Sequence, residues 1–264
     1  MASQSGGKTC SYTVDERGIA IMTINNPPMN TLSQPVLQDM KSAILAANTD
    51  PAVRVVVFTG AGKAFIAGAE IREFLNVNTV KEGDALLQNG QGILNLIENA
   101  DKPYIAAING YCLGGGAETA LACHIRLADE NAQIGLPEIK LGIIPGYGGT
   151  QRTPRLIGKG RAYELILSGN FLNGRQAELY GLVNRATPAG QVVEEATKLA
   201  AAIAARGRIA VKNAMRAIKE GVLKEFMEAQ AFERQLFGEL SQTEDKKEGV
   251  AAFLEKREAR FKDR

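Results

Sequence analysis

The sequence contains few of the residues on which many catalytic and metal sites depend. Its 264 residues include one histidine, His124, and three cysteines, Cys10, Cys112 and Cys123. The cysteine spacing matches neither a metal site nor a disulfide framework, which is typical of a reducing cytoplasm. A single histidine disfavours a histidine-based triad and a histidine-rich metal site. We therefore expect no metal ion, a cytoplasmic location, and acid–base chemistry performed mainly by carboxylates.

Long apolar runs are also missing. No stretch has the length needed to span a bilayer, and residues 1–9 lack the apolar segment of a secretory signal. The net charge of +2 gives no reason to expect nucleic acid or an anionic membrane as a partner. Residues 1–10 are expected to form a flexible N-terminus.

The remaining sequence alternates predicted strands and helices, which favours an α/β fold. Strands are expected as a hairpin over residues 11–25, then at 53–58, 104–108, 125–128, 132–135 and 182–185. Helices are expected over residues 35–47 and 83–99, directly after the glycines at 114–116, and over most of the chain beyond residue 155.

One glycine-rich loop has part of the phosphate-binding loop motif but lacks two of its required residues. Gly62 and Lys63 follow the strand predicted at 53–58, but Val57 occupies the place of the first required glycine. Ala64 stands where Ser or Thr would coordinate magnesium. No glycine cluster matches the dinucleotide fingerprint in a strand-to-helix context either.

The most informative segment is residues 109–123, where three glycines separate a predicted buried strand from an alanine-rich predicted helix. Unpaired N–H groups at a helix N-terminus favour negative charge. Glu118 lies in the first turn, and its helical neighbours are small or apolar: Gly114, Gly115, Leu121 and Ala122. Burial among them would raise the pKa of this carboxyl group. The alternatives are a solvated surface glutamate and glycines that serve only close packing.

Two further segments add candidate ligand-binding groups. Glu138 opens a short predicted helical turn, where a carboxylate is also favoured by the helix dipole alone, and a second glycine-rich turn spans residues 143–152. Residues 67–69 form a small-residue turn that either presents N–H groups to a ligand or is an ordinary tight connection. Two glycine-rich turns and two carboxylates within about forty residues indicate one site built on loops.

Three blocks, in this order and spacing, resemble the crotonase (enoyl-CoA hydratase/isomerase) superfamily, closest to its bacterial short-chain enoyl-CoA hydratases. They are residues 63–70 (KAFIAGAE), 108–118 (INGYCLGGGAE) and 135–146 (GLPEIKLGIIPG). The resemblance implies an α/β spiral of ββα repeats over residues 11–200. It also implies a helical C-terminal part over residues 201–264 that forms a homotrimer or a dimer of trimers.

The resemblance also implies roles for individual residues. The main-chain N–H groups of Ala69 and Gly115 would form an oxyanion hole, and Glu118 and Glu138 would hold the attacking water and exchange a proton with the α-carbon. The main chain of Gly146 would help to place that water. The positions implied to touch coenzyme A are Ala67, Arg72, Phe253 and Lys256. Coenzyme A is then part of the substrate, and no separate cofactor is expected.

The expected activity is reversible syn addition of water to a trans-2-enoyl-CoA, as in fatty acid β-oxidation. Alternatives are an enoyl-CoA isomerase, or a hydratase of a dienoyl or cyclic acyl-CoA. A further alternative is an RNA-binding protein on the same fold. An RNA-binding relative would need a lysine-dense exposed helix, whereas residues 219–247 mix glutamates with the cations. The sequence leaves the acyl-chain length and the pathway open.

Overall fold

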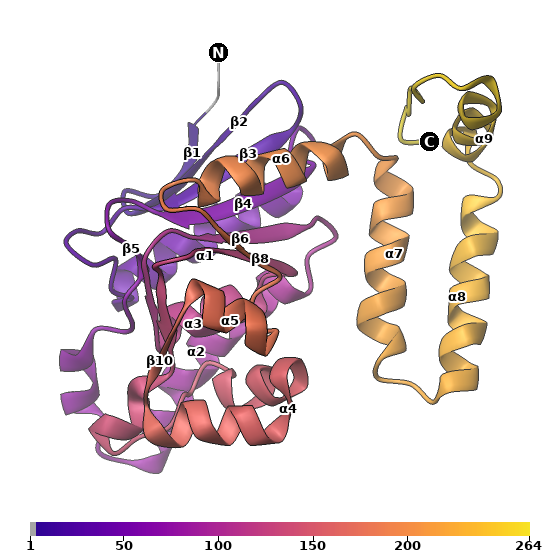
Figure 1. The fold of residues 1–264 in the computed structure, drawn as a ribbon. Coiled ribbons are helices and arrows are strands. Elements are labelled where there is room, and N and C mark those ends of the chain that lie inside the picture. Colours follow the sequence, from indigo (N-terminus) through magenta and orange to yellow (C-terminus); the bar gives the residue numbers. More distant parts are fainter. Residues whose placement is uncertain (1–3) are drawn as a thin grey trace. The chain divides into compact units, whose positions relative to one another are not determined.

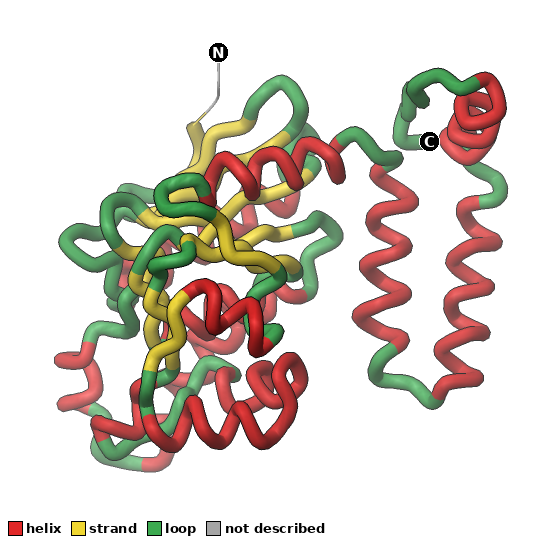
Figure 2. The backbone as a smooth tube through the Cα atoms, viewed as in Figure 1, coloured by secondary structure: helices red, strands yellow, loops and turns green. Residues whose placement is uncertain are grey.

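The computed structural model describes residues 4–264, which divide into two compact units between Ala200 and Ala201. The first unit contains two β-sheets with helices packed on them (Figure 1). The second contains the end of α6 and three further helices, shown in red in Figure 2. No helix among the described residues is long and apolar enough to cross a membrane.

A seven-stranded sheet forms the centre of the first unit. The first three strands are antiparallel and the other four continue in parallel. In spatial order the strands are β1 (Gln4–Gly6), β2 (Cys10–Val14), β3 (Ile19–Ile24), β4 (Val55–Gly60), β6 (Tyr104–Ile108), β8 (Ile125–Asp129) and β11 (Arg185–Thr187). Every residue of β4 and β6 is buried, as is typical of central parallel strands covered on both faces.

The first unit also contains a second sheet, which has four short strands. Its order is β10 (Phe171–Asn173), β9 (Gln133–Gly135), β7 (Tyr111–Leu113) and β5 (Ala64–Ile66). Each pair of consecutive strands contributes its first strand to the large sheet (β4, β6, β8) and its second to the small one (β5, β7, β9). A helical segment follows each pair, so the expected spiral of ββα repeats is confirmed.

Helices connect these repeats. In chain order they are α1 (Gln34–Thr49), the 3₁₀ helix η1 (Ile71–Asn76), α2 (Val80–Glu98), α3 (Gly115–Ala122), the 3₁₀ helix η2 (Pro137–Leu141), α4 (Gly149–Ser168), α5 (Gly174–Tyr180) and α6 (Val192–Ala204). A capping box formed by Thr79 and Glu82 starts α2. The predicted hairpin and the helices expected at 35–47 and 83–99 are therefore confirmed.

The helix α3 lies unusually close to the small sheet. A Cβ built on Gly116 would overlap the carbonyl oxygen of Ile66 in β5. Only glycine permits this approach of a helix to a strand backbone. The glycine segment therefore does serve close packing, in addition to any role in binding.

The N-terminal residues differ from the expected flexible segment. Residues 4–6 form β1, which pairs antiparallel with β2, and Cys10 is buried in β2. The side chain of Asp39 accepts hydrogen bonds from both the N–H and the hydroxyl of Thr9, at 2.8 Å each. Backbone pairing and this polar contact hold a segment whose sequence carries no clear strand pattern. Residues 1–3 of the predicted segment lie outside the described residues.

The second unit is helical, with α7 (Arg208–Gly221), α8 (Phe226–Leu240) and α9 (Glu244–Glu255). Within it, α7 packs against α8 and the amide of Asn213 donates to the carbonyl of Leu236. The last residues fold back onto α9, where the buried carboxylate of Asp245 accepts the N–H groups of Lys262 and Asp263. The helical C-terminal segment expected from the sequence thus consists of separate helices with their own contacts.

Candidate active site

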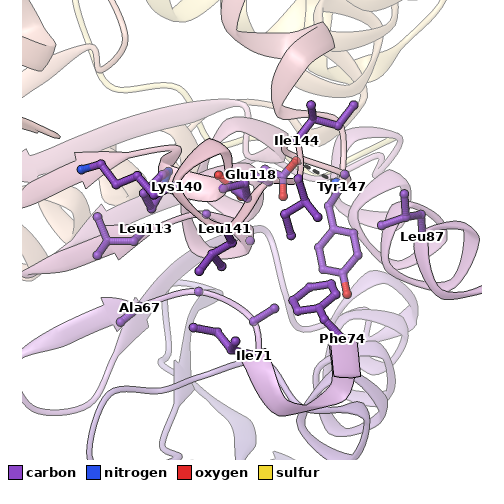
Figure 3. A pocket seen from close by; sticks show the side chains of 18 residues that line it. Ala67, Ile71, Phe74, Leu87, Leu113, Glu118, Lys140, Leu141, Ile144 and Tyr147 are labelled. Carbon is purple, nitrogen blue, oxygen red and sulfur yellow. Dashed lines mark hydrogen bonds between the residues drawn. The ribbon is translucent and has the colours of Figure 1, made fainter. Parts of the chain in front are cut away.

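The first unit contains a cavity of about 340 Å³ with a mainly apolar lining (Figure 3). Three segments of the chain and one residue of α2 form its wall: residues 67–74, 113–118 and 137–147, with Leu87. Most of these residues belong to the three blocks that carry the family resemblance; Ile71, Phe74, Leu87 and Tyr147 lie outside them. The fold therefore brings these blocks to one place.

The order of strands in the small sheet explains this convergence. β5, β7 and β9 are parallel neighbours, and each cavity segment follows one of them. The carboxyl ends of parallel strands lie at one edge of a sheet, which is where α/β proteins place ligands. The predicted site built on loops thus rests on a rigid sheet edge.

Among the residues that line this cavity, Ala69 and Gly115 each have a backbone N–H group with no acceptor within residues 4–264. Ala69 forms a parallel bridge with Leu32, in which the neighbours Gly68 and Glu70 make the hydrogen bonds to Leu32. In such a bridge the N–H of the central residue, here Ala69, points away from the partner Leu32. Gly115 is the first residue of α3, so its N–H has no partner inside the helix.

Glu118 is buried deep in the cavity wall, with 2% of its surface exposed. Its Oε1 accepts the N–H groups of Tyr147 and Gly149, each at 2.7 Å, and these bonds stabilise the ionised carboxylate. Burial acts in the opposite direction and prevails, raising the pKa of Glu118 to about 7. The burial and raised pKa predicted from its apolar helical neighbours are confirmed.

Glu138 lies on η2 and lines the same cavity. A Cβ built on Gly114 would stand 2.9 Å from Glu138 Oε1, so this carboxyl group lies against the start of α3. Its Oε2 is buried and has no hydrogen-bond partner within the described chain. Burial raises the pKa of Glu138 as well. An unpartnered buried carboxyl oxygen beside a cavity is a ready acceptor or donor for a bound molecule.

The charge of Glu138 acts electrostatically on the carboxyl group of Glu118. The negative charge of Glu138 contributes to the raised pKa of Glu118, after the larger effect of burial. Two interacting carboxyl groups lose their protons in separate steps that belong to the pair. A pair that holds one proton between its two members supplies both a general acid and a general base.

A turn from residue 145 to 149 fixes the Glu118 carboxylate. The guanidinium of Arg152 donates to the carbonyl of Tyr147 at 2.8 Å and also binds the side chains of Glu98 and Asn95. Its positive charge lowers the pKa of Glu118, against the effect of burial. Arg152 thus acts on the carboxylate through the Tyr147 backbone and through its charge.

Gly146 lies in the same turn and lines the cavity. Its carbonyl accepts the side-chain amide of Gln91 at 2.8 Å, and its N–H has no acceptor among the described residues. The free N–H of Gly146 is compatible with the predicted water-positioning role, which remains a prediction.

The residues predicted to touch coenzyme A are spread across the chain. Ala67 lines the cavity, whereas Arg72 on η1 is exposed and not part of the lining. Phe253 and Lys256 belong to the second unit, where Phe253 is 84% exposed and Lys256 follows the end of α9. Their contacts with coenzyme A also remain predictions.

Sequence reasoning missed two residues that shape this site, Tyr147 and Arg152. Tyr147 is 5% exposed, and its ring forms one side of the cavity. Burial raises its pKa to about 12, so its hydroxyl is neutral at physiological pH. The only sequence signal for either residue was the glycine-rich turn at 143–152, which contains both.

The chain is similar over nearly its whole length to known proteins. The family model for enoyl-CoA hydratase/isomerase matches residues 15–264. The crotonyl-CoA hydratase of Syntrophomonas wolfei is 42% identical over 250 residues, 93% of this chain and 95% of that protein. The short-chain-enoyl-CoA hydratase of Clostridium acetobutylicum is 41% identical over 252 residues, 94% of this chain and 96% of that protein. The crystal structure of an enoyl-CoA hydratase from Bacillus anthracis has a TM-score of 0.89 at 37% identity, covering 100% of this chain and 99% of that one.

Proposed function

We propose that this chain, which belongs to the enoyl-CoA hydratase/isomerase family, adds water reversibly to a trans-2-enoyl-CoA and gives the 3-hydroxyacyl-CoA. The single observation that carries the proposal is the shared cavity, in which Glu118 and Glu138 lie with the free N–H groups of Ala69 and Gly115. Relatives more than 40% identical that are named as hydratases of crotonyl-CoA and short-chain enoyl-CoA support it.

The N–H groups of Ala69 and Gly115 would bind the thioester carbonyl oxygen. When water attacks C3 of the conjugated thioester, negative charge develops on this oxygen as an enolate forms. Backbone donors already held in place stabilise that charge without reorganising, and one such donor is commonly worth about 3 kcal/mol in the transition state. The N-terminus of α3 adds its dipole in the same direction.

Glu118 and Glu138 would deliver the two parts of water to one face of the double bond. One carboxylate accepts a proton from the water as its oxygen bonds to C3, and the other carboxyl group gives its proton to C2. After the step the proton has moved from one member of the pair to the other, so product release and exchange with solvent restore the starting state. In the reverse direction each group takes the opposite role.

Coenzyme A recognition and assembly belong to the same proposal. We place the coenzyme A moiety beside Ala67, with Arg72, Phe253 and Lys256 as further contacts. A homotrimer or a dimer of trimers is proposed, supported by large apolar side chains left exposed on the second unit, including Phe226, Met227, Phe237 and Leu254. Light scattering coupled to size exclusion tests the assembly.

Mixing the protein with crotonyl-CoA tests the function. Loss of the absorbance of the conjugated enoyl thioester, with 3-hydroxybutyryl-CoA identified as the product, is the expected result. Shifting of a 3-enoyl-CoA into conjugation without hydration would instead identify an isomerase. Absence of turnover with every straight-chain 2-enoyl-CoA would overturn the proposal.

A further inference from the structure

The ring of Tyr147 is held between two glycines on different helices. A Cβ built on Gly115 of α3 would lie 3.5 Å from Tyr147 Cδ2, and one built on Gly90 of α2 would overlap the opposite edge of the ring. One edge of the ring therefore faces the oxyanion donor Gly115, and the other packs directly on the α2 backbone. The ring fills the space between the reaction centre and that helix.

The backbone of Tyr147 leaves the ring little freedom to move aside. Its N–H donates to Glu118 and its carbonyl accepts Arg152, so both sides of the residue are fixed. Next to it, Leu87 of α2 packs against Gly146, where a Cβ would stand 2.5 Å from Leu87 Cδ2. A buried ring that is attached to a fixed backbone and packed along one edge on α2 is a rigid wall.

The cavity has two distinguishable ends on either side of Glu118 (Figure 3). Ala67, Leu113 and Lys140 lie at one end, and Tyr147, Leu87 and Phe74 lie at the other. Lys140 is exposed and cationic, so its end suits the phosphates of coenzyme A. The aromatic and aliphatic end suits a hydrocarbon chain. A thioester bound between the two ends therefore directs its acyl chain toward Tyr147.

We infer that Tyr147 is a specificity-determining residue, which closes the acyl end of the cavity and restricts the enzyme to short-chain 2-enoyl thioesters. This inference rests on the proposed function and names its substrate class. A four-carbon chain ends close to the carboxylates. Each further methylene of a longer chain meets the Tyr147 ring or has to extend out of the cavity. Loss or clash of one methylene in an apolar pocket commonly changes kcat/KM by about 10 to 200-fold.

The test compares kcat/KM for crotonyl-CoA with that for trans-2-octenoyl-CoA. The wild type is expected to prefer the four-carbon ester by at least about tenfold. Tyr147→Ala removes the ring and is expected to reduce or reverse this preference by about tenfold or more. Tyr147→Leu, which keeps a bulky side chain, is expected to give an intermediate ratio.

Tyr147→Phe is the matched control, because it keeps the ring and removes only the hydroxyl group. Its ratio is expected to equal that of the wild type. A ratio of two substrates is unaffected by partial loss of folded protein, so a less stable variant still reports on the pocket. Circular dichroism and size exclusion establish whether each variant is folded. If Tyr147→Ala does not fold, Tyr147→Leu replaces it in the test.

Failure of this inference is distinguishable from failure of the proposed function. Wild type that hydrates crotonyl-CoA and octenoyl-CoA equally well, or a ratio unchanged in both Tyr147→Ala and Tyr147→Leu, overturns the specificity role and leaves the hydratase intact. Wild type that hydrates neither ester overturns the short-chain specificity, and wild type that hydrates no straight-chain 2-enoyl-CoA of any length overturns the proposed function itself.

Discussion

Arg152 and Glu118 bind the same residue from opposite sides. The guanidinium of Arg152 donates to the carbonyl of Tyr147 at 2.8 Å, and the carboxylate of Glu118 accepts the N–H of Tyr147 at 2.7 Å. Arg152 does not line the cavity, so any effect on the reaction must pass through this turn or through its charge.

We predict that Arg152→Gln lowers kcat by about tenfold with a smaller change in KM, because the residue acts through Glu118 and not on bound substrate. Loss of its positive charge also raises the pKa of Glu118 further. The limb of the pH profile of kcat/KM that reports Glu118 is therefore expected to move to higher pH. Arg152→Lys keeps the charge and is expected to leave that limb in place. Superimposable profiles for wild type and Arg152→Gln would contradict the prediction.

Glu118→Gln and Glu138→Gln are each expected to lower kcat for crotonyl-CoA by about 10² to 10⁴-fold, because each removes a proton-transfer group. Glutamine is nearly isosteric, and its amide oxygen at position 118 still accepts the Tyr147 and Gly149 N–H groups. Binding of a non-reactive acyl-CoA, measured by calorimetry, is expected to change little. Glu16→Gln, on the exposed β2–β3 turn, is the control. Undiminished turnover in either site variant would show that the residue has no catalytic role.

Glu118 also makes stability depend on pH. Its pKa rises from an ordinary 4.5 to about 7 in the folded protein, where burial disfavours the charged form. Between these values the folded state binds more protons than the unfolded chain, so stability falls as pH rises through this window. The full effect is about 3 kcal/mol at most. Glu118→Gln does not titrate, so its Tm relative to wild type at equal protein concentration is expected to be higher at pH 8 than at pH 5. A difference in Tm that is independent of pH would refute this.

Gly116→Ala is expected to destabilise the protein by about 1–3 kcal/mol and to lower activity, because its Cβ overlaps the Ile66 carbonyl and forces α3 away from β5. Gly92→Ala provides the matched control. Gly92 lies within α2 with open space around the position of a Cβ, so alanine there is expected to stabilise by about 0.5–1 kcal/mol. Thermal or denaturant unfolding measures both, and equal effects at the two sites would contradict the packing argument.

Gly90 and Tyr147 are expected to be energetically coupled. Gly90→Ala places a methyl group into the Tyr147 ring and is expected to destabilise the protein by about 1–3 kcal/mol. The Tyr147→Ala background lacks the three ring atoms nearest to the new methyl group, so most of this loss is expected to disappear. A double-mutant cycle measured by unfolding gives the coupling directly. Additive effects would mean that the ring does not pack on Gly90 in solution.

The local periodicity of the sequence predicted those elements that it encodes strongly. The hairpin of β2 and β3, the apolar face of α1 and the buried runs of β4 and β6 all follow from the spacing of apolar residues. The burial of Glu118 followed in the same way, because its neighbours in the helix are fixed by the chain itself. The order of the three blocks indicated the family, and the family resemblance predicted the overall fold.

Features that depend on distant parts of the chain were not predicted. β7 and β10 have three residues each, too few for a recognisable alternation, and their strand conformation comes from pairing with β9. The first half of α4 contains Pro154 and the non-helical Gly158, which weaken its helical pattern. The role of Tyr147 depends on Gly90, which belongs to a helix much earlier in the chain.

The two free N–H donors at Ala69 and Gly115 belong to the main chain, and their directions follow from the bridge between Ala69 and Leu32 and from the start of α3 at Gly115. Their presence is thus independent of which side chains occupy positions 69 and 115, apart from steric limits. Under the proposed function, replacing both carboxylates would leave these two donors in place to bind a thioester carbonyl oxygen. Under the same proposal, new chemistry on this scaffold would require only new acids and bases, because the two donors depend on the backbone and not on side chains.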